Sequence, residues 1–128
     1  MPTPMLTLSV LPGSYAICRL GPDAPVPDWA RDARFRSITR TQDELSVVCS
    51  GANVPGDIRA DRGWRIIKVR GPLDLAQVGI LAALSKPLAD AGISVFAVST
   101  YDTDYLLVKA DALEPAVSVL SAHGHRFD

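Results

Sequence analysis

The second half of the chain alternates between apolar strand-like runs and stretches with helical spacing. Residues 64–69 are apolar and β-branched, a composition that predicts a strand, and Gly71-Pro72 ends it. Apolar residues between 75 and 88 recur at helical spacing. The pattern therefore predicts a helix that Asp74 caps and Gly92 stops.

Pro87 lies inside this helical pattern, so we expect the helix to kink near Ala83 or to divide there. Residues 93–99 are apolar on both faces and predict a central strand. The remaining elements are a polar turn at 102–104, a return strand at 105–109, a helix that Asp111 caps and Gly124 ends, and a short strand at 125–127. The order β-α-β-β-α-β is that of a ferredoxin-like unit.

The first half of the chain gives a weaker version of the same pattern. Strands are predicted at 5–11, 15–20, 35–40 and 45–49, with a turn at Pro12-Gly13 between the first two. Pro22 to Pro27 reads as a rigid loop, and Asp28 caps a helical turn that extends to Ala33. Residues 50–63 are interpreted as a loop or a short helix.

An internal repeat connects the two halves. At an offset of 60 residues, Ile38 aligns with Val98 and Val48 with Val108, so the two hairpins coincide. At an offset of 50, Gly21-Pro22 aligns with Gly71-Pro72. The change of offset lies in the proline-rich loop, where the first copy has a shorter connection. We therefore predict a duplication, with one unit at 1–63 and the other at 64–128.

The second unit resembles an ACT domain. The resemblance rests on Gly71-Pro72-Leu73-Asp74-Leu75 after the first strand, on Ala91-Gly92-Ile93-Ser94-Val95, and on the hairpin Ser99 to Tyr105. It is greatest for the ACT type of the CASTOR arginine sensors and of small bacterial tandem-ACT proteins, and weaker for the regulatory ACT pair of aspartate kinases. It implies an α+β fold of two ferredoxin-like (βαββαβ) ACT units side by side, with antiparallel sheets and helices on one face.

The resemblance also implies a ligand site. In ACT domains the loop after the first strand meets the second strand of a neighbouring copy, and an amino acid lies between them. The candidate ligand-binding residues are therefore Gly71, Pro72, Leu73, Asp74, Ser99, Thr100, Tyr101, Asp102 and Asp104, with Glu44 as the repeat counterpart of Asp104. Asp104 would balance an ammonium or guanidinium group. The alternatives are a tight strand-to-helix turn at 71–74 and a solvated hairpin turn at 102–104.

Charge and composition exclude several classes of protein. The 128 residues carry a net charge of −1, so the chain has no electrostatic surface for nucleic acid or an anionic membrane. No apolar run approaches the length of a membrane span, and the N-terminus lacks the positive start of a signal peptide. Cys18 and Cys49 lie in apolar strands, which predicts reduced core thiols in a cytoplasmic protein.

Catalytic and metal-binding patterns are not found in the sequence. It contains no nucleophile elbow, no HExxH motif and no glycine-rich phosphate loop. The two histidines, His123 and His125, flank Gly124 near the chain end, and we interpret them as a solvated terminus rather than as metal ligands. We therefore predict neither an enzyme nor a cofactor.

The sequence thus predicts a cytoplasmic sensor or regulatory protein that binds a small molecule, which we expect to be an amino acid, and acts on an unidentified partner protein. Uncovered sheet edges predict a homodimer. The first alternative is an ACT-fold interaction module whose site is vestigial, and the second is a small ferredoxin-like enzyme.

Overall fold

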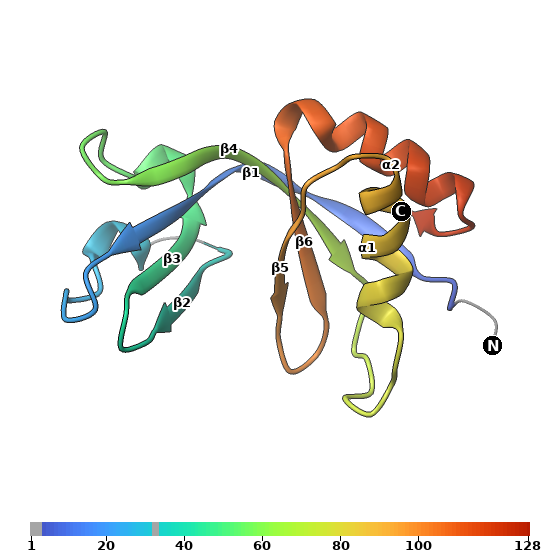
Figure 1. Ribbon diagram of the computed structural model, residues 1–128, viewed down its shortest axis with the longest axis horizontal. Coiled ribbons are helices and arrows are strands. Elements are labelled where there is room, and N and C mark those ends of the chain that lie inside the picture. Colours follow the sequence, from blue (N-terminus) through green and yellow to red (C-terminus); the bar gives the residue numbers. More distant parts are fainter. Residues whose placement is uncertain (1–3, 32–33) are drawn as a thin grey trace. The chain divides into compact units, whose positions relative to one another are not determined.

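The computed structural model describes residues 4–31 and 34–128 (Figure 1). The chain forms two compact units, which we call the helical unit (Met1–Pro12 with Arg65–Asp128) and the strand unit (Gly13–Trp64). Strands β1 (Thr7–Leu20) and β4 (Ala60–Val69) run through both units. This division differs from the sequential units predicted at 1–63 and 64–128, because the start of β1 belongs to the helical unit.

Backbone hydrogen bonds explain why the start of β1 belongs to the helical unit. The N–H of Arg70, just after β4, donates to the carbonyl of Thr7 over 2.8 Å. Thr7 also pairs in parallel with Arg126 of β7 (Arg126–Phe127). The predicted turn at Pro12-Gly13 is therefore wrong: β1 is one continuous strand. Gly13 has a φ of 98°, a backbone conformation that glycine adopts without strain inside the strand.

The helical unit has the predicted β-α-β-β-α-β order after β1. Its other elements are α1 (Ile80–Asp90), β5 (Phe96–Ser99), β6 (Asp104–Lys109), a 3₁₀ turn (Ala110–Ala112) and α2 (Leu113–Ala122). The strand order is β7-β1-β4-β6-β5, and β5 and β6 are antiparallel. β5 is the last strand in this order, so the prediction of a central strand at 93–99 is wrong. The last strand predicted at 125–127 is present as β7.

Helix α1 begins later than its apolar pattern predicts. Asp74 does not cap it, because its carboxylate accepts the N–H of Ala76 over 2.9 Å within the preceding loop. The helix starts instead after Gly79, which has a φ of 83°. The end is as predicted: Gly92 has a φ of 76°, and the next N–H, of Ile93, donates to Leu88 over 2.9 Å.

Both helices of this unit pack on one face of its sheet, as predicted. Alternate residues of β4 and β6, Ile67, Val69, Leu106 and Val108, form a single core cluster with residues of both helices, Leu84, Leu88, Ala116 and Leu120. Since alternate strand residues share a face, the two helices cover the same face. α1 continues through Pro87 as one element, so the predicted division near Ala83 does not occur.

The strand unit contains β2 (Ser37–Arg40), β3 (Leu45–Ser50) and parts of β1 and β4, in the order β2-β3-β1-β4. Two 3₁₀ turns, Asp28–Ala30 and Gly51–Asn53, stand where a ferredoxin-like unit has α-helices. The predicted helical turn from Asp28 is thus shorter than expected, and residues 32–33 lie outside the described residues. Cys18 and Cys49 are buried free thiols in this unit's core, as predicted.

Candidate functional site

The loop after β4 and the β5–β6 turn meet in one cavity of about 150 Å³, which we call the hairpin cavity. Its lining contains seven of the predicted site residues and four others: Leu73, Asp74, Ser99, Thr100, Tyr101, Asp102 and Asp104, with Leu75, Gln77, Ile80 and Thr103. All of these belong to the helical unit. Both walls therefore come from a single unit, whereas the sequence analysis placed the ligand between two copies.

Gly71 brings the loop close to the turn. A Cβ atom at this position would lie 2.8 Å from the carbonyl oxygen of Asp102 and 3.1 Å from the Cβ of Thr103. Two residues later, the N–H of Leu73 donates to the same Asp102 oxygen over 2.6 Å. Gly71 and Pro72 do not themselves line the cavity. Their contribution is to let the loop approach the turn, so that Leu73 and Asp74 reach it.

Thr103 joins the β5–β6 turn to the end of β4. It was not predicted as a site residue. Its side chain is buried, and its hydroxyl donates to the carbonyl of Val69 over 2.6 Å. The hydroxyl of Thr100 accepts the N–H of Thr103 over 3.3 Å, and the N–H of Thr100 donates to the carbonyl of Thr103 over 2.8 Å. A β-branched hydroxyl residue between two aspartates was the available signal.

Asp104 lies at the start of β6, directly opposite Ser99 of β5. Its carboxylate accepts the Ser99 hydroxyl over 2.6 Å, and its side chain is partly buried. Asp74 and Asp102 add two further carboxylates, whereas none of the described residues that line the cavity is Lys or Arg. The site is therefore strongly electronegative, and it favours a ligand that carries a positive charge.

The start of α1 supplies the opposite polarity at the same cavity. Ile80, the first residue of the helix, is among the lining residues, and Gly79 before it provides no side-chain cap. The first N–H groups of a helix have no intrahelical partner and favour an anion. The cavity thus combines acceptors for a cationic group with backbone donors for a carboxylate. Tyr101 and Leu75 are 80% and 68% exposed.

Besides Gly71 and Pro72, Glu44 is the predicted site residue that does not line this cavity. It lies in the strand unit, next to the first residue of β3. There its carbonyl accepts the N–H of Thr41 over 2.9 Å and closes the β2–β3 turn.

The prediction of a solvated histidine terminus is wrong for His125. Its side chain is only 4% exposed, and its Nδ1 accepts the N–H of Leu6 over 3.2 Å. β7 pairs with β1 and draws this residue into the unit. His123 is exposed, with its Nδ1 2.9 Å from the carbonyl oxygen of Val119. Within residues 4–31 and 34–128, no three His, Cys, Asp or Glu side chains form a group that could hold a metal ion.

No helix within the described part of the chain is both long and apolar enough to cross a membrane.

Comparison with solved structures supports the fold. The chain superposes on a crystal structure of an Agobacterium tumefaciens protein with a TM-score of 0.92 and 42% identity, covering 98% of this chain and 93% of that one. The regulatory subunit of aspartate kinase from Thermus flavus gives a TM-score of 0.66 at 10% identity, covering 94% and 99%. At this low identity the kinase subunit supports the fold alone.

Curated relatives match a shorter segment. The cytosolic arginine sensor for mTORC1 subunit 1 from Homo sapiens is 38% identical over 58 residues, and the Bos taurus protein gives the same values. The match covers 44% of this chain and 18% of each sensor, so most of each sensor has no counterpart here.

Two family models match successive parts of the chain. One, described only as the N-terminal domain of a protein family, matches residues 13–57, which lie within the strand unit. The other, described as the ACT domain, matches residues 59–122. This segment is half of the chain and includes the hairpin cavity with its loop, turn and helix start. The chain therefore belongs to the ACT domain family.

Proposed function

We propose that this protein is a non-catalytic regulatory module that binds an amino acid with a cationic side chain in the hairpin cavity. One observation carries the proposal: three carboxylates line the cavity, and none of its described lining residues is basic. A ligand that leaves water for such a site must bring compensating positive charge. An ammonium or guanidinium group on a side chain, together with the α-ammonium, supplies it.

Each part of such a ligand has a partner in the cavity. Asp104, already oriented by the Ser99 hydroxyl, accepts hydrogen bonds from the cationic group. The uncapped N–H groups at Ile80 bind the α-carboxylate. The names of the relatives agree with this chemistry, because the curated ones are arginine sensors and the kinase subunits are regulatory.

A regulatory role also fits the ACT family, since the regulatory subunits of aspartate kinase share this fold. In this role the protein changes the activity of a separate partner when the ligand binds. A catalytic role would need a nucleophile or base held close to the bound ligand. The described lining of the hairpin cavity contains no histidine or cysteine, and we assign its carboxylates to charge binding.

A thermal-shift screen of the twenty amino acids tests the proposal. A ligand at 100 times its dissociation constant raises the free energy of unfolding by about 2.7 kcal/mol. For a chain of this size the melting temperature then rises by several degrees. We expect arginine or lysine to produce this shift and aspartate and glutamate to produce none. If no amino acid shifts the transition, the hairpin cavity is not an amino-acid site.

A second candidate function is an interaction module whose cavity is vestigial. The observation in its favour is the exposure of Leu75 and Tyr101, two large side chains that line the hairpin cavity. Apolar groups at such positions can mark a protein interface. Under this alternative, Tyr101→Ser weakens association with the partner protein, whereas neither arginine nor lysine shifts the thermal transition.

We also propose that the protein is a cytoplasmic homodimer built on a duplicated fold. β5 ends the strand order and offers an edge for a second copy. The elements from β1 to β4 follow the same order as those from β4 to β7, with 3₁₀ turns in place of the helices. This recurrence supports duplication. Free thiols at Cys18 and Cys49 fit a reducing compartment. Sedimentation that detects only a 13.7 kDa species at micromolar concentration would contradict the dimer.

A further inference from the structure

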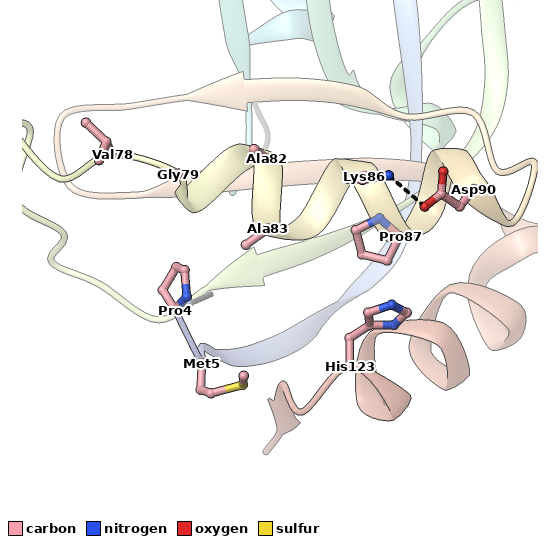
Figure 2. Close-up of a pocket in the computed structure, with 10 residues that line it drawn as sticks. All are labelled: Pro4, Met5, Val78, Gly79, Ala82, Ala83, Lys86, Pro87, Asp90 and His123. Carbon is pink, nitrogen blue, oxygen red and sulfur yellow. Dashed lines mark hydrogen bonds and ion pairs between the residues drawn. The ribbon is translucent and has the colours of Figure 1, made fainter. Parts of the chain in front are cut away.

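A second cavity of the helical unit differs from the hairpin cavity in size and chemistry. It measures about 520 Å³, which is within the range of small-molecule sites. We call it the helix cavity, because α1 forms one wall and the end of α2 contributes another, with Pro4 and Met5 before β1 between them (Figure 2). None of the residues that line it also lines the hairpin cavity.

One end of the helix cavity is apolar. Met5 and Val78 are 63% and 76% exposed, although both side chains are fully apolar. Ala82 and Ala83 of α1 also line the cavity, and their side chains are short (Figure 2). An apolar ligand group at this end would cover surface that water now contacts, which is favourable.

The other end of the helix cavity holds one cation and two acceptors. The Nζ of Lys86 lies 3.1 Å from an oxygen of Asp90, one turn further along α1. His123 of the α2 end points toward Pro87 (Figure 2). Its Nδ1 is 2.9 Å from the carbonyl oxygen of Val119, a contact that needs a proton on Nδ1. In the neutral ring Nε2 is then an acceptor.

We propose that the helix cavity binds an apolar molecule with a zwitterionic head, the chemistry of an α-amino acid with an aliphatic or aromatic side chain. The side chain occupies the apolar end. The carboxylate pairs with Lys86, and the ammonium pairs with Asp90 and with Nε2 of His123. An exposed ion pair on a helix surface is weak, so Lys86 and Asp90 rearrange readily around the head.

Charge separates this site from the hairpin cavity. Lys86 and Asp90 offer one group of each charge, which matches the two charges of a zwitterionic head, whereas three carboxylates and no basic side chain line the described hairpin cavity. The two sites therefore select different ligands. The inference does not depend on the function proposed for the hairpin cavity.

Titration of L-phenylalanine into the full chain, followed by amide NMR shifts, tests the proposal. We expect saturable shifts centred on Ala82, Ala83 and His123. N-acetyl-L-phenylalanine lacks the ammonium and L-phenylalanine amide lacks the carboxylate, so each should bind about tenfold more weakly or worse. Equal binding of either analogue would overturn the zwitterionic head. Shifts centred on Ser99 to Asp104, or no saturable shift up to the solubility limit, would overturn the site.

Variants on α1 give a matched comparison. Ala82→Leu fills the cavity and should abolish binding, whereas Ala89→Leu adds the same side chain to the same helix outside the lining and should leave it unchanged. Lys86→Gln and Asp90→Asn should each weaken binding of phenylalanine. Binding unaffected by both charge variants, or tightened by Asp90→Asn, would overturn the assignment of the head. Asp104→Ala should have no effect, and a loss there would place phenylalanine in the hairpin cavity.

Discussion

The Nε2 atom of His125 lies 3.4 Å from the carbonyl oxygen of Ala83, across the space between the chain end and α1. This carbonyl is the one that the N–H of residue 87 would bind in an ordinary helix, and Pro87 has no N–H. Since Leu6 donates to Nδ1, the proton of the neutral ring is on Nε2, directed at Ala83. His125 thus supplies the donor that Pro87 removes and joins α1 to the start of β1.

We predict that His125→Ala lowers the free energy of unfolding by about 1–3 kcal/mol, because it leaves the Leu6 N–H and the Ala83 carbonyl without their partner. In a Pro87→Ala background, the new N–H of residue 87 reaches the Ala83 carbonyl, so the loss from His125→Ala should be smaller. Urea unfolding of the four proteins of this double-mutant cycle measures the difference, expected at about 0.5–1 kcal/mol. Equal losses in both backgrounds would show that His125 and the Ala83 carbonyl are not coupled.

The order of elements in the helical unit could be predicted, because each element there carries a local signal. Gly92 and Gly124 both have a positive φ where the sequence analysis ended a helix. The errors arise where partners distant in the sequence decide the outcome. β1 passes through Pro12-Gly13 as one strand because it pairs with β3, β4 and β7, and none of these pairings is visible locally. His125 is buried for the same reason.

The loop and turn of the hairpin cavity could be predicted from the family motif, and the structure brings them together. The omission of Gln77 and Ile80 follows from one error in α1. With the helix starting near Asp74, Gln77 and Ile80 would be ordinary helix positions, but both line the cavity because the helix starts at Ile80. Asp74 is a good helix cap in general, and here it satisfies the loop N–H of Ala76.

Gly71→Ala should lower stability by about 1–3 kcal/mol, because the added methyl group would lie 2.8 Å from the Asp102 oxygen and must push the loop away from the turn. Gly56→Ala is the matched control, since no atom lies within 4 Å of a Cβ there. Its effect should stay within about 1 kcal/mol. Thermal unfolding compares the two. Similar losses would mean that the close approach at Gly71 does not stabilise the fold.

Stability should fall as the pH rises above about 8.5, the usual pKa of a cysteine. The side-chain hydrogen bond with Cys18, and then burial, raise the pKa of Cys49, so the folded protein keeps a proton that the unfolded chain loses. The hydrogen bond from Cys49 lowers the pKa of Cys18, so Cys18 opposes this fall only until its thiol in the unfolded chain has also ionised. Because the unfolded chain then binds fewer protons than the folded protein, the free energy of unfolding falls by up to about 1.4 kcal/mol per pH unit.

Urea unfolding of the parent and of a variant with both Cys18→Ala and Cys49→Ala at pH 7.5, 8.5 and 9.5 checks this prediction, because Cys49→Ala alone would leave Cys18 a buried thiol without the hydrogen bond that lowers its pKa. The variant is less stable at every pH because it loses buried volume, but its stability should change less between pH 8.5 and 9.5 than that of the parent. Parallel curves would show that Cys49 does not hold its proton in the folded state.

Asp104→Ala should weaken binding of a cationic amino acid by about 1.5–3 kcal/mol, the usual value of a hydrogen bond to a charged group. Asp104 is partly buried and oriented by Ser99, whereas Asp102 is exposed, so Asp102→Ala should cost less than about 0.5 kcal/mol. Asp104→Asn keeps an acceptor for the Ser99 hydroxyl and removes only the charge. A loss with Asn close to that with Ala would therefore assign the effect to charge.

Calorimetric titration of arginine and lysine measures these affinities, and unchanged melting temperatures separate lost binding from lost folding. If both alanine variants bind the ligand as tightly as the parent, the assignment of Asp104 is wrong. The backbone groups of the loop and of the α1 start must then bind the ligand.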